Sequence, residues 1–176
     1  THEDPTLLTA SLTDGAVLLE AGPEAQMWCP VDGGGAAFYA RRFAHETAIH
    51  CADAALPLGI EFVIDANVAM DGIDEWLELG SLPFHFEVHP QVRELLGPGR
   101  TIGLHATDTD AHWLLDLTGE VITWRRCDEL AAAGIRAPVT DLLLAVYRRR
   151  PVGADGIEVT DDAGLVDFWL ERVGFG

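Results

Sequence analysis

The stretch TIGLHATDTDAHWLLDLTGEVITWR, residues 101–125, decides the fold of this chain. Apolar and polar residues alternate through much of it with a period of two, which indicates β-strands. The turn-forming sequences DTDA and TG separate three strand candidates, at Thr101–Thr107, His112–Leu117 and Glu120–Arg125. Short strands joined by tight turns are typical of an antiparallel meander, so we expect an antiparallel sheet in the C-terminal half.

Helical patterns flank this meander on both sides. Ala36–Ala55 is rich in Ala and has no Gly or Pro, which predicts a firm helix. Pro138 suits the first turn of a helix that runs to Arg150, and Asp161 or Asp162 can cap a last helix. We therefore expect an α+β fold. The weaker predictions are helices at Asp4–Glu20 and Ala69–Leu79, a loop at Ala21–Gly35, and strands at Ala132–Arg136 and Gly156–Thr160.

The segment Ser81–Arg100 has a mixed pattern. PFHFEVHP alternates like a strand, whereas QVREL resembles a helical turn. On a strand, His85, Glu87 and His89 would share one face and form a metal-binding cluster. Because prolines flank these residues, we interpret the histidine-containing part as a solvated loop.

Composition restricts the classes of partner. The chain has 176 residues, 48% of them hydrophobic, which suffices for one sizeable core or for a small domain with part of another. The net charge of −18 would repel a phosphate backbone and an anionic membrane surface, so we expect neither nucleic acid nor membrane as a partner. We see no membrane-spanning run and no signal-peptide pattern at residues 1–5, which predicts a cytoplasmic protein.

The Ala36–Ala55 helix carries the candidate chemistry. Tyr39, Phe43, Glu46, His50 and Asp53 follow steps of three and four, which places them on one stripe. Side chains four apart differ by about 40° in direction and about 6 Å in height, so Glu46 and His50 can reach one ion. Carboxylate and imidazole ligands fit zinc or a similar borderline divalent ion. The alternative is an ordinary surface Glu–His pair, and Asp53 is a candidate acceptor for an imidazole N–H.

The sequence of this helix resembles that of a known protein family. ARRFAHETAIHCADA, residues 40–54, is similar to the RRxAHETAVHRxDA signature of the mycothiol-dependent maleylpyruvate isomerase family. Further similar segments follow in the family's order. They are DGIDEWL at 71–77, LHATD at 104–108, HWLL at 112–115 and APVTDLLLAVYRRRP at 137–151.

The resemblance implies a DinB-like metal-binding helical bundle followed by a small, sterol-carrier-like α+β domain. On this basis we divide the chain into residues 1–56, the later helices of the bundle, and residues 57–176, the C-terminal domain. The family's metal is held by a histidine from an earlier helix and by a Glu and a His one turn apart, which Glu46 and His50 match. No upstream histidine except His2 is present, so we expect a missing N-terminal segment or a second chain to complete the bundle.

The resemblance also implies a reaction. A zinc-class metal and mycothiol, the thiol cosubstrate, would act on a small electrophilic acid in an isomerisation or S-transfer. Arg149 is the candidate for the family's C-terminal arginine, which neutralises an anionic substrate. The alternative for Arg149 is a cation that stabilises a helix C-terminus. Two other functions stay open, a non-catalytic module that binds a small ligand and an inactive relic of the enzyme family.

His105, within LHATD, has two interpretations. Its imidazole either faces the active-site side or makes a hydrogen bond in the core, and we favour the core hydrogen bond. The three cysteines show no CxxC spacing, so we expect reduced thiols at Cys29, Cys51 and Cys127.

Overall fold

The computed structural model describes residues 16–31 and 33–173. The chain divides into two compact units, residues 1–51 and residues 52–176. This division falls within helix α2 (Gly35–Ala55), whereas the domain boundary predicted from the sequence lies just after that helix. The predicted helix at 4–20 lies mostly outside the described residues, and residues 16–21 are helical.

Helix α2 confirms the helix predicted from the Ala-rich stretch, and it begins one residue earlier. The connecting loop before it is confirmed by the irregular backbone of its described part. At the start of the helix, the backbone N–H of Gly35 donates to Sγ of Cys29 at 3.2 Å. A Cβ at Gly34 would lie 2.8 Å from the same sulfur, so only glycine fits the turn into α2 at this position.

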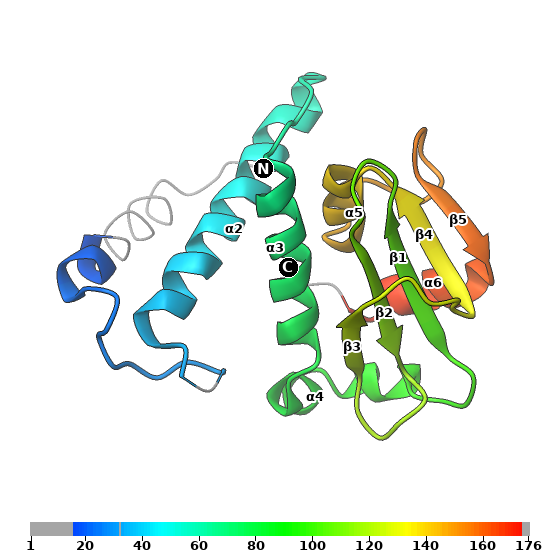
Figure 1. The fold of residues 1–176 in the computed structure, drawn as a ribbon, viewed down its shortest axis with the longest axis horizontal. Coiled ribbons are helices and arrows are strands. Elements are labelled where there is room, and N and C mark those ends of the chain that lie inside the picture. The colour runs from blue at the N-terminus through cyan, green and yellow to red at the C-terminus, as the bar shows by residue number, and fades with distance from the viewer. Residues whose placement is uncertain (1–15, 32, 174–176) are drawn as a thin grey trace. The chain divides into compact units, whose positions relative to one another are not determined.

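The second unit is built on a five-stranded mixed sheet in the order β3-β2-β1-β4-β5 (Figure 1). The meander prediction is confirmed, because β1 pairs with β2 and β2 with β3, both antiparallel. Beyond the meander the sheet is mixed, since β4 lies parallel to β1. The β3–β4 connection, residues 127–132, returns the chain to the end of the sheet where β1 begins, so the two strands run in the same direction. The strands are β1 (Thr101–Ala106), β2 (His112–Asp116), β3 (Thr123–Arg126), β4 (Ala133–Ala137) and β5 (Glu158–Asp161).

One face of this sheet is apolar and is covered by helices. Helix α5 (Val139–Val146) packs on β1 and β4, α6 (Ala163–Leu170) packs on β4 and β5, and α3 (Ala66–Gly80) packs on α5. The strand side chains beneath them are almost fully buried, as alternation on a half-covered sheet requires. The largest of them are Ile102, Leu104, Trp113, Leu115 and Ile135.

Two tryptophans join the helices inside this core. Trp76 of α3 and Trp169 of α6 meet edge to face, with ring centroids 5.6 Å apart and an interplanar angle of 76°. Both side chains are almost completely removed from solvent. Edge-to-face aromatic pairs of this kind stabilise a core beyond the area that they bury.

Several predicted boundaries need correction. Helix α3 begins at Ala66, because the carboxylate of Asp65 accepts from the N–H of Asn67 and caps the helix. The segment interpreted as a loop is helical, with α4 (Pro83–Val88) started by a proline in its first turn. The QVREL turn is confirmed within the 3-10 helix η2 (Pro90–Leu95). A second short 3-10 helix, η1, spans Leu56–Leu58.

The helix predicted to run from Pro138 to Arg150 is shorter than expected. It ends at Val146, and Arg148 has a positive φ of 60°, which a continued α-helix does not allow. Strand β3 also starts later than predicted, at Thr123. The cap of the last helix is Asp162, whose carboxylate accepts from the N–H of Leu165.

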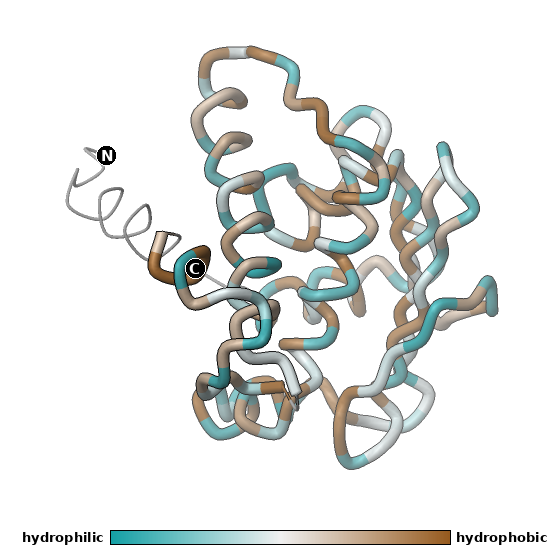
Figure 2. The backbone as a smooth tube through the Cα atoms, turned by 60° about the vertical axis from the view of Figure 1, so that its left-hand side comes forward, coloured by the Kyte–Doolittle hydropathy of each residue, from teal (hydrophilic) through white to brown (hydrophobic). Residues whose placement is uncertain are grey.

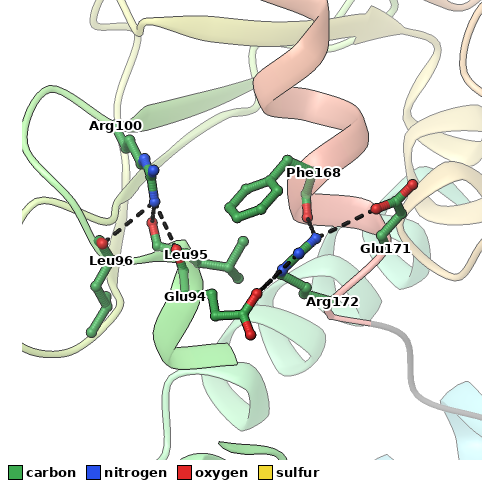
Figure 3. Close-up of polar contacts among 7 residues, drawn as sticks. All are labelled: Glu94, Leu95, Leu96, Arg100, Phe168, Glu171 and Arg172. Carbon is green, nitrogen blue, oxygen red and sulfur yellow. Dashed lines mark hydrogen bonds and ion pairs between the residues drawn. The ribbon is translucent and has the colours of Figure 1, made fainter. Parts of the chain in front are cut away.

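Two arginines, Arg100 and Arg172, link η2 to α6 through polar contacts (Figure 3). The Arg172 guanidinium donates to Oε2 of Glu94 at 3.0 and 3.1 Å and lies 3.7 Å from the centroid of the Phe168 ring. On the other side, Arg100 lies 5.3 Å from the same ring and donates to the carbonyl oxygens of Glu94 and Leu95. These contacts satisfy carbonyls at the end of η2 and hold the two helical segments together.

Figure 2 shows hydrophilic and hydrophobic residues interspersed along the helices and strands, as in amphipathic elements around a core. Among the described residues, no helix combines the length and the apolar character that crossing a bilayer requires.

Candidate functional site

Helix α2 brings Glu46 and His50 together, as their spacing predicts. Oε2 of Glu46 and Nε2 of His50 lie 3.6 Å apart, and the side chains are 34% and 59% exposed. The other carboxylate oxygen, Oε1, accepts a hydrogen bond from Arg42, one turn earlier on the helix. The pair therefore presents one carboxylate oxygen and one imidazole nitrogen at a common point. His45 is buried, and five residues from His50 along the helix it points in a different direction from this pair.

Arg149 lies in the turn that follows α5 and is tied to the end of α2. Its Nε and Nη2 donate to the two carboxylate oxygens of Asp53 at 2.9 and 3.2 Å, a bidentate arrangement. Its Nη1 donates to the carbonyl of Tyr147 at 2.9 Å, and Tyr147 is the C-cap of α5. The contact with the Tyr147 carbonyl agrees with the helix-end role suggested for Arg149, whereas its contact with a substrate stays a prediction.

The histidines of α4 form a second predicted group. His85 is buried, and its ring lies 4.9 Å from that of His89, centroid to centroid. Burial lowers the pKa of His85, and the neighbouring His89 lowers it further. Because the segment is a helix, Glu87 does not share the face of these two histidines, so the strand-based cluster of all three is wrong.

A third group of ligand-type side chains was not predicted as a site. His105 of β1 and His112 of β2 are direct partners in the antiparallel register, with ring centroids 5.3 Å apart and an interplanar angle of 49°. Asp128, in the β3–β4 connection, places Oδ1 3.6 Å from Nδ1 of His105. Each of the three residues offers a ligand atom, and these atoms lie within 4.8 Å of one another. We call His105, His112 and Asp128 the sheet-face cluster.

The sheet-face cluster lies on the face opposite the helices. Along β1, Ile102, Leu104 and Ala106 are buried toward the helices, so His105 projects to the other side. The β3–β4 connection crosses this face, as Figure 1 shows. Beneath it lies a cavity of about 350 Å³, whose lining includes His105, Asp128 and Arg136.

Gly103 makes room for the His105 ring on this face. A Cβ at Gly103 would lie 2.5 Å from Nε2 of His105, so a side chain there would overlap the ring. An added Cβ at Gly134 would lie 3.7 Å from Cδ2 of the same ring, an ordinary contact distance. The core hydrogen bond expected for His105 is not found at Nδ1, which is buried without a hydrogen-bond partner.

Electrostatics favour the uncharged form of His105. Burial lowers its pKa most, and His112 and Arg136 lower it further, while Asp128 acts in the opposite direction. A neutral imidazole keeps a lone pair free for a metal or a donor.

Sequence reasoning named His105 but missed the cluster. The hairpin itself was predicted, but a turn formed by DTDA, residues 108–111, would pair residue 107 with His112, and only the observed register places His105 opposite His112. The position of Asp128 follows only from the course of the β3–β4 connection.

Replacing Gly103 with alanine is expected to lower the free energy of unfolding by about 1–3 kcal/mol, because the new methyl group overlaps the His105 ring. Urea unfolding followed by tryptophan fluorescence measures the loss. The control is Gly119→Ala, where the nearest atom is 3.6 Å from the added Cβ, and we expect a change within about 0.5 kcal/mol. Equal losses for both variants would show that the His105 ring does not depend on the bare backbone beneath it.

The second unit is an α+β domain with ligand-type side chains on one face of its sheet, and the first unit carries the Glu46–His50 pair on α2. No family model matches the sequence, and no curated protein matches it. Among solved structures, the chain is similar to the ubiquinone synthesis protein UbiJ-SCP2, with 14% identity and a TM-score of 0.39, over 63% of this chain and 93% of that one. It is also similar to sterol carrier protein 2 like 2 from Aedes aegypti, with 15% identity and a TM-score of 0.30, over 50% and 94%.

Another similar structure is the inverting sec-alkylsulfatase Pisa1 from a Pseudomonas species, with 13% identity and a TM-score of 0.41. The similarity covers 48% of this chain and spans 14% of the alkylsulfatase. The expected α+β class is confirmed by the five-stranded sheet and the helices that cover it. These likenesses concern the fold alone and give no family assignment.

Proposed function

We propose that this protein is a metal-dependent, thiol-using isomerase or S-transferase that acts on a small electrophilic acid, with mycothiol as the thiol. The observation that carries the proposal is the Glu46–His50 pair, whose oxygen and nitrogen lie 3.6 Å apart on one face of α2. Around a tetrahedral ion with bonds of about 2.0–2.1 Å, two ligand atoms are about 3.3 Å apart. The pair fits two positions of such an ion after a shift of a few tenths of an ångström.

Zinc or a similar divalent ion suits this donor set, since it accepts both carboxylate oxygen and imidazole nitrogen. When bound, such an ion would stabilise the thiolate form of a thiol cosubstrate. Arg42 supports the site from its own helix. Its hydrogen bond to Oε1 of Glu46 orients the carboxylate and leaves Oε2 directed toward His50.

Arg149 is the proposed contact for the carboxylate of the substrate. Its side chain is 26% exposed, and its bidentate bond to Asp53 holds the planar guanidinium in one orientation. A substrate carboxylate would share or replace Asp53 in that contact, because both groups fit the same donor geometry.

Removing either member of the pair is expected to remove one divalent ion per chain. Glu46→Ala and His50→Ala each leave the ion with only one ligand from the pair. We therefore expect loss of that ion after dialysis and loss of thiol-dependent turnover. Elemental analysis measures the metal, and a spectrophotometric assay with mycothiol and maleylpyruvate measures turnover. Thr47→Ala, at an exposed position on the same helix, is the control and should retain both. Full metal retention in both variants would end the proposal.

A second candidate is non-catalytic binding of a small ligand by the C-terminal unit. It is favoured by the cavity of about 350 Å³ beneath the β3–β4 connection, which belongs to that unit alone. Ligand binding that persists in Glu46→Ala and His50→Ala, with no turnover in the parent protein, would support this candidate. Metal bound at Glu46 and His50 without thiol-dependent turnover would indicate an inactive relic of the enzyme family.

A further inference from the structure

We propose that the sheet-face cluster is a second metal site, in which His105, His112 and Asp128 bind a divalent transition-metal ion of the zinc class. This site lies entirely within the second unit and is independent of Glu46 and His50. Four observations carry the proposal: the register of the strands, the unsatisfied imidazole atoms, the position of the carboxylate and the charge of the cavity.

The strand register presents the two imidazoles together. His105 and His112 are opposite residues of an antiparallel pair, which places their Cβ atoms about 4.5–5.5 Å apart on one face. Because both strands are anchored in the sheet, their backbone does not need to move for the two rings to reach one ion. Ligands built on strands hold their geometry better than ligands built on loops.

The imidazoles contain polar atoms that the protein leaves without hydrogen bonds. Nδ1 of His105 and Nδ1 of His112 are both buried, and neither has a hydrogen-bond partner. Buried polar atoms are almost always paired, so each of these two atoms lacks an expected partner, and one ligand nitrogen of each ring lies within 4.8 Å of the other. A metal ion can accept one lone pair from each ring at the same time.

Asp128 provides the third ligand from a segment that can adjust. Its carboxylate is 3.6 Å from Nδ1 of His105, and its side chain is 74% exposed on the β3–β4 connection. The separations of up to 4.8 Å in the cluster exceed the about 3.3 Å expected between ligands of a tetrahedral ion. Rotation of the exposed aspartate and a small tilt of the rings can close this difference.

The charge of the surroundings favours a cation. Asp128, Glu129 and Asp161 line the cavity together with a single basic residue, Arg136. Glu129 is partly neutralised by Arg125, with hydrogen bonds of 2.7 and 3.4 Å. On the adjacent strand β5, Glu158 is the register partner of Arg136, and its negative charge opposes that of the arginine.

Two imidazoles and one carboxylate select the class of metal. Mg²⁺ and Ca²⁺ prefer oxygen ligands, whereas zinc and its neighbours in the first transition row accept imidazole. Three protein ligands leave at least one position for water or a small ligand from the cavity. The proposed site is therefore open and exchangeable, in contrast to a closed structural zinc site.

The test uses the full chain carrying Glu46→Ala and His50→Ala, so that the first site makes no contribution. Calorimetric titration with Zn²⁺ should show one ion bound per chain. Asp128→Asn should weaken binding by roughly 10-fold or more, and His105→Gln or His112→Gln should weaken it further, because loss of a direct ligand exceeds the 10–100-fold effect of an outer-shell partner. Asp110→Asn, an exposed acid in the β1–β2 turn, is the matched control and should bind normally.

Imidazole nitrogen resonances give a second readout that does not depend on the stability of the variants. On addition of Zn²⁺, the resonances of His105 and His112 should shift together, while those of His89 stay unchanged. Absence of stoichiometric binding in the double variant, or binding without a shift at His105 and His112, would overturn this inference. Neither result bears on Glu46 and His50, whose role is read from the difference between the parent protein and the double variant.

Discussion

Replacing Trp169 with alanine is expected to lower the free energy of unfolding of the second unit by about 3–5 kcal/mol. The side chain is fully buried in α6 and meets Trp76 edge to face at 5.6 Å. Removal loses the transfer free energy of the indole, leaves a cavity, and breaks an aromatic pair worth about 0.5–1.5 kcal/mol. A change of this size is a large part of the 5–15 kcal/mol that stabilises a typical domain.

Urea unfolding measured by circular dichroism tests this expectation, and Trp169→Phe provides the control. Nε1 of Trp169 is buried without a hydrogen-bond partner, so phenylalanine removes an unsatisfied N–H while it keeps most of the apolar ring. We therefore expect a much smaller loss for phenylalanine than for alanine. If alanine costs less than about 1 kcal/mol, the junction between α3 and α6 is not the centre of the core.

The second large effect is expected at Asp74 of α3. One carboxylate oxygen, Oδ1, accepts from Nε1 of the buried Trp113 at 2.7 Å and from Nε of Arg126 at 3.0 Å. The other, Oδ2, accepts from Nη2 of Arg126 at 2.6 Å. Asp74→Ala leaves the indole N–H without this acceptor, at a cost of about 1–3 kcal/mol, and removes an ion pair that is partly exposed and worth less than about 1 kcal/mol. We expect a total loss of about 2–3 kcal/mol.

Asp74→Asn separates these two contributions. The amide oxygen of asparagine can still accept from the Trp113 indole, whereas the charge that pairs with Arg126 is lost. Its cost should therefore stay below about 1 kcal/mol in chemical denaturation. If asparagine destabilises as much as alanine, the ion pair rather than the indole hydrogen bond is the dominant contribution.

Elements with a local signal were predicted well. The α2 helix follows from an Ala-rich stretch without breakers, and β1 and β2 follow from alternation bounded by turn residues. Errors arose where a tertiary contact overrides local preference. The α4 segment, which we interpreted as a solvated loop, is a helix that buries His85 and Phe86. The helix after Pro138 stops at Val146 although the arginines that follow are good helix formers.

The candidate sites also differ in whether a local sequence pattern predicts them or only the tertiary structure brings their residues together. Glu46 and His50 are four residues apart, so the helical period alone predicts that they approach each other. The role of this pair as metal ligands stays a prediction. The bond between Arg149 and Asp53 joins residues 96 positions apart, and no local pattern contains it.

By itself, the sequence determined the helix that carries Glu46, His50 and Asp53, the three-stranded meander, and the α+β class, because each depends on periodicity over a few neighbouring residues. Only the tertiary structure decided the parallel pairing of β1 with β4 and the meeting of Asp128 with His105 and His112. These features depend on the path of a connection across the sheet. Such a path is set by packing between distant segments, which leaves no periodic trace in the sequence.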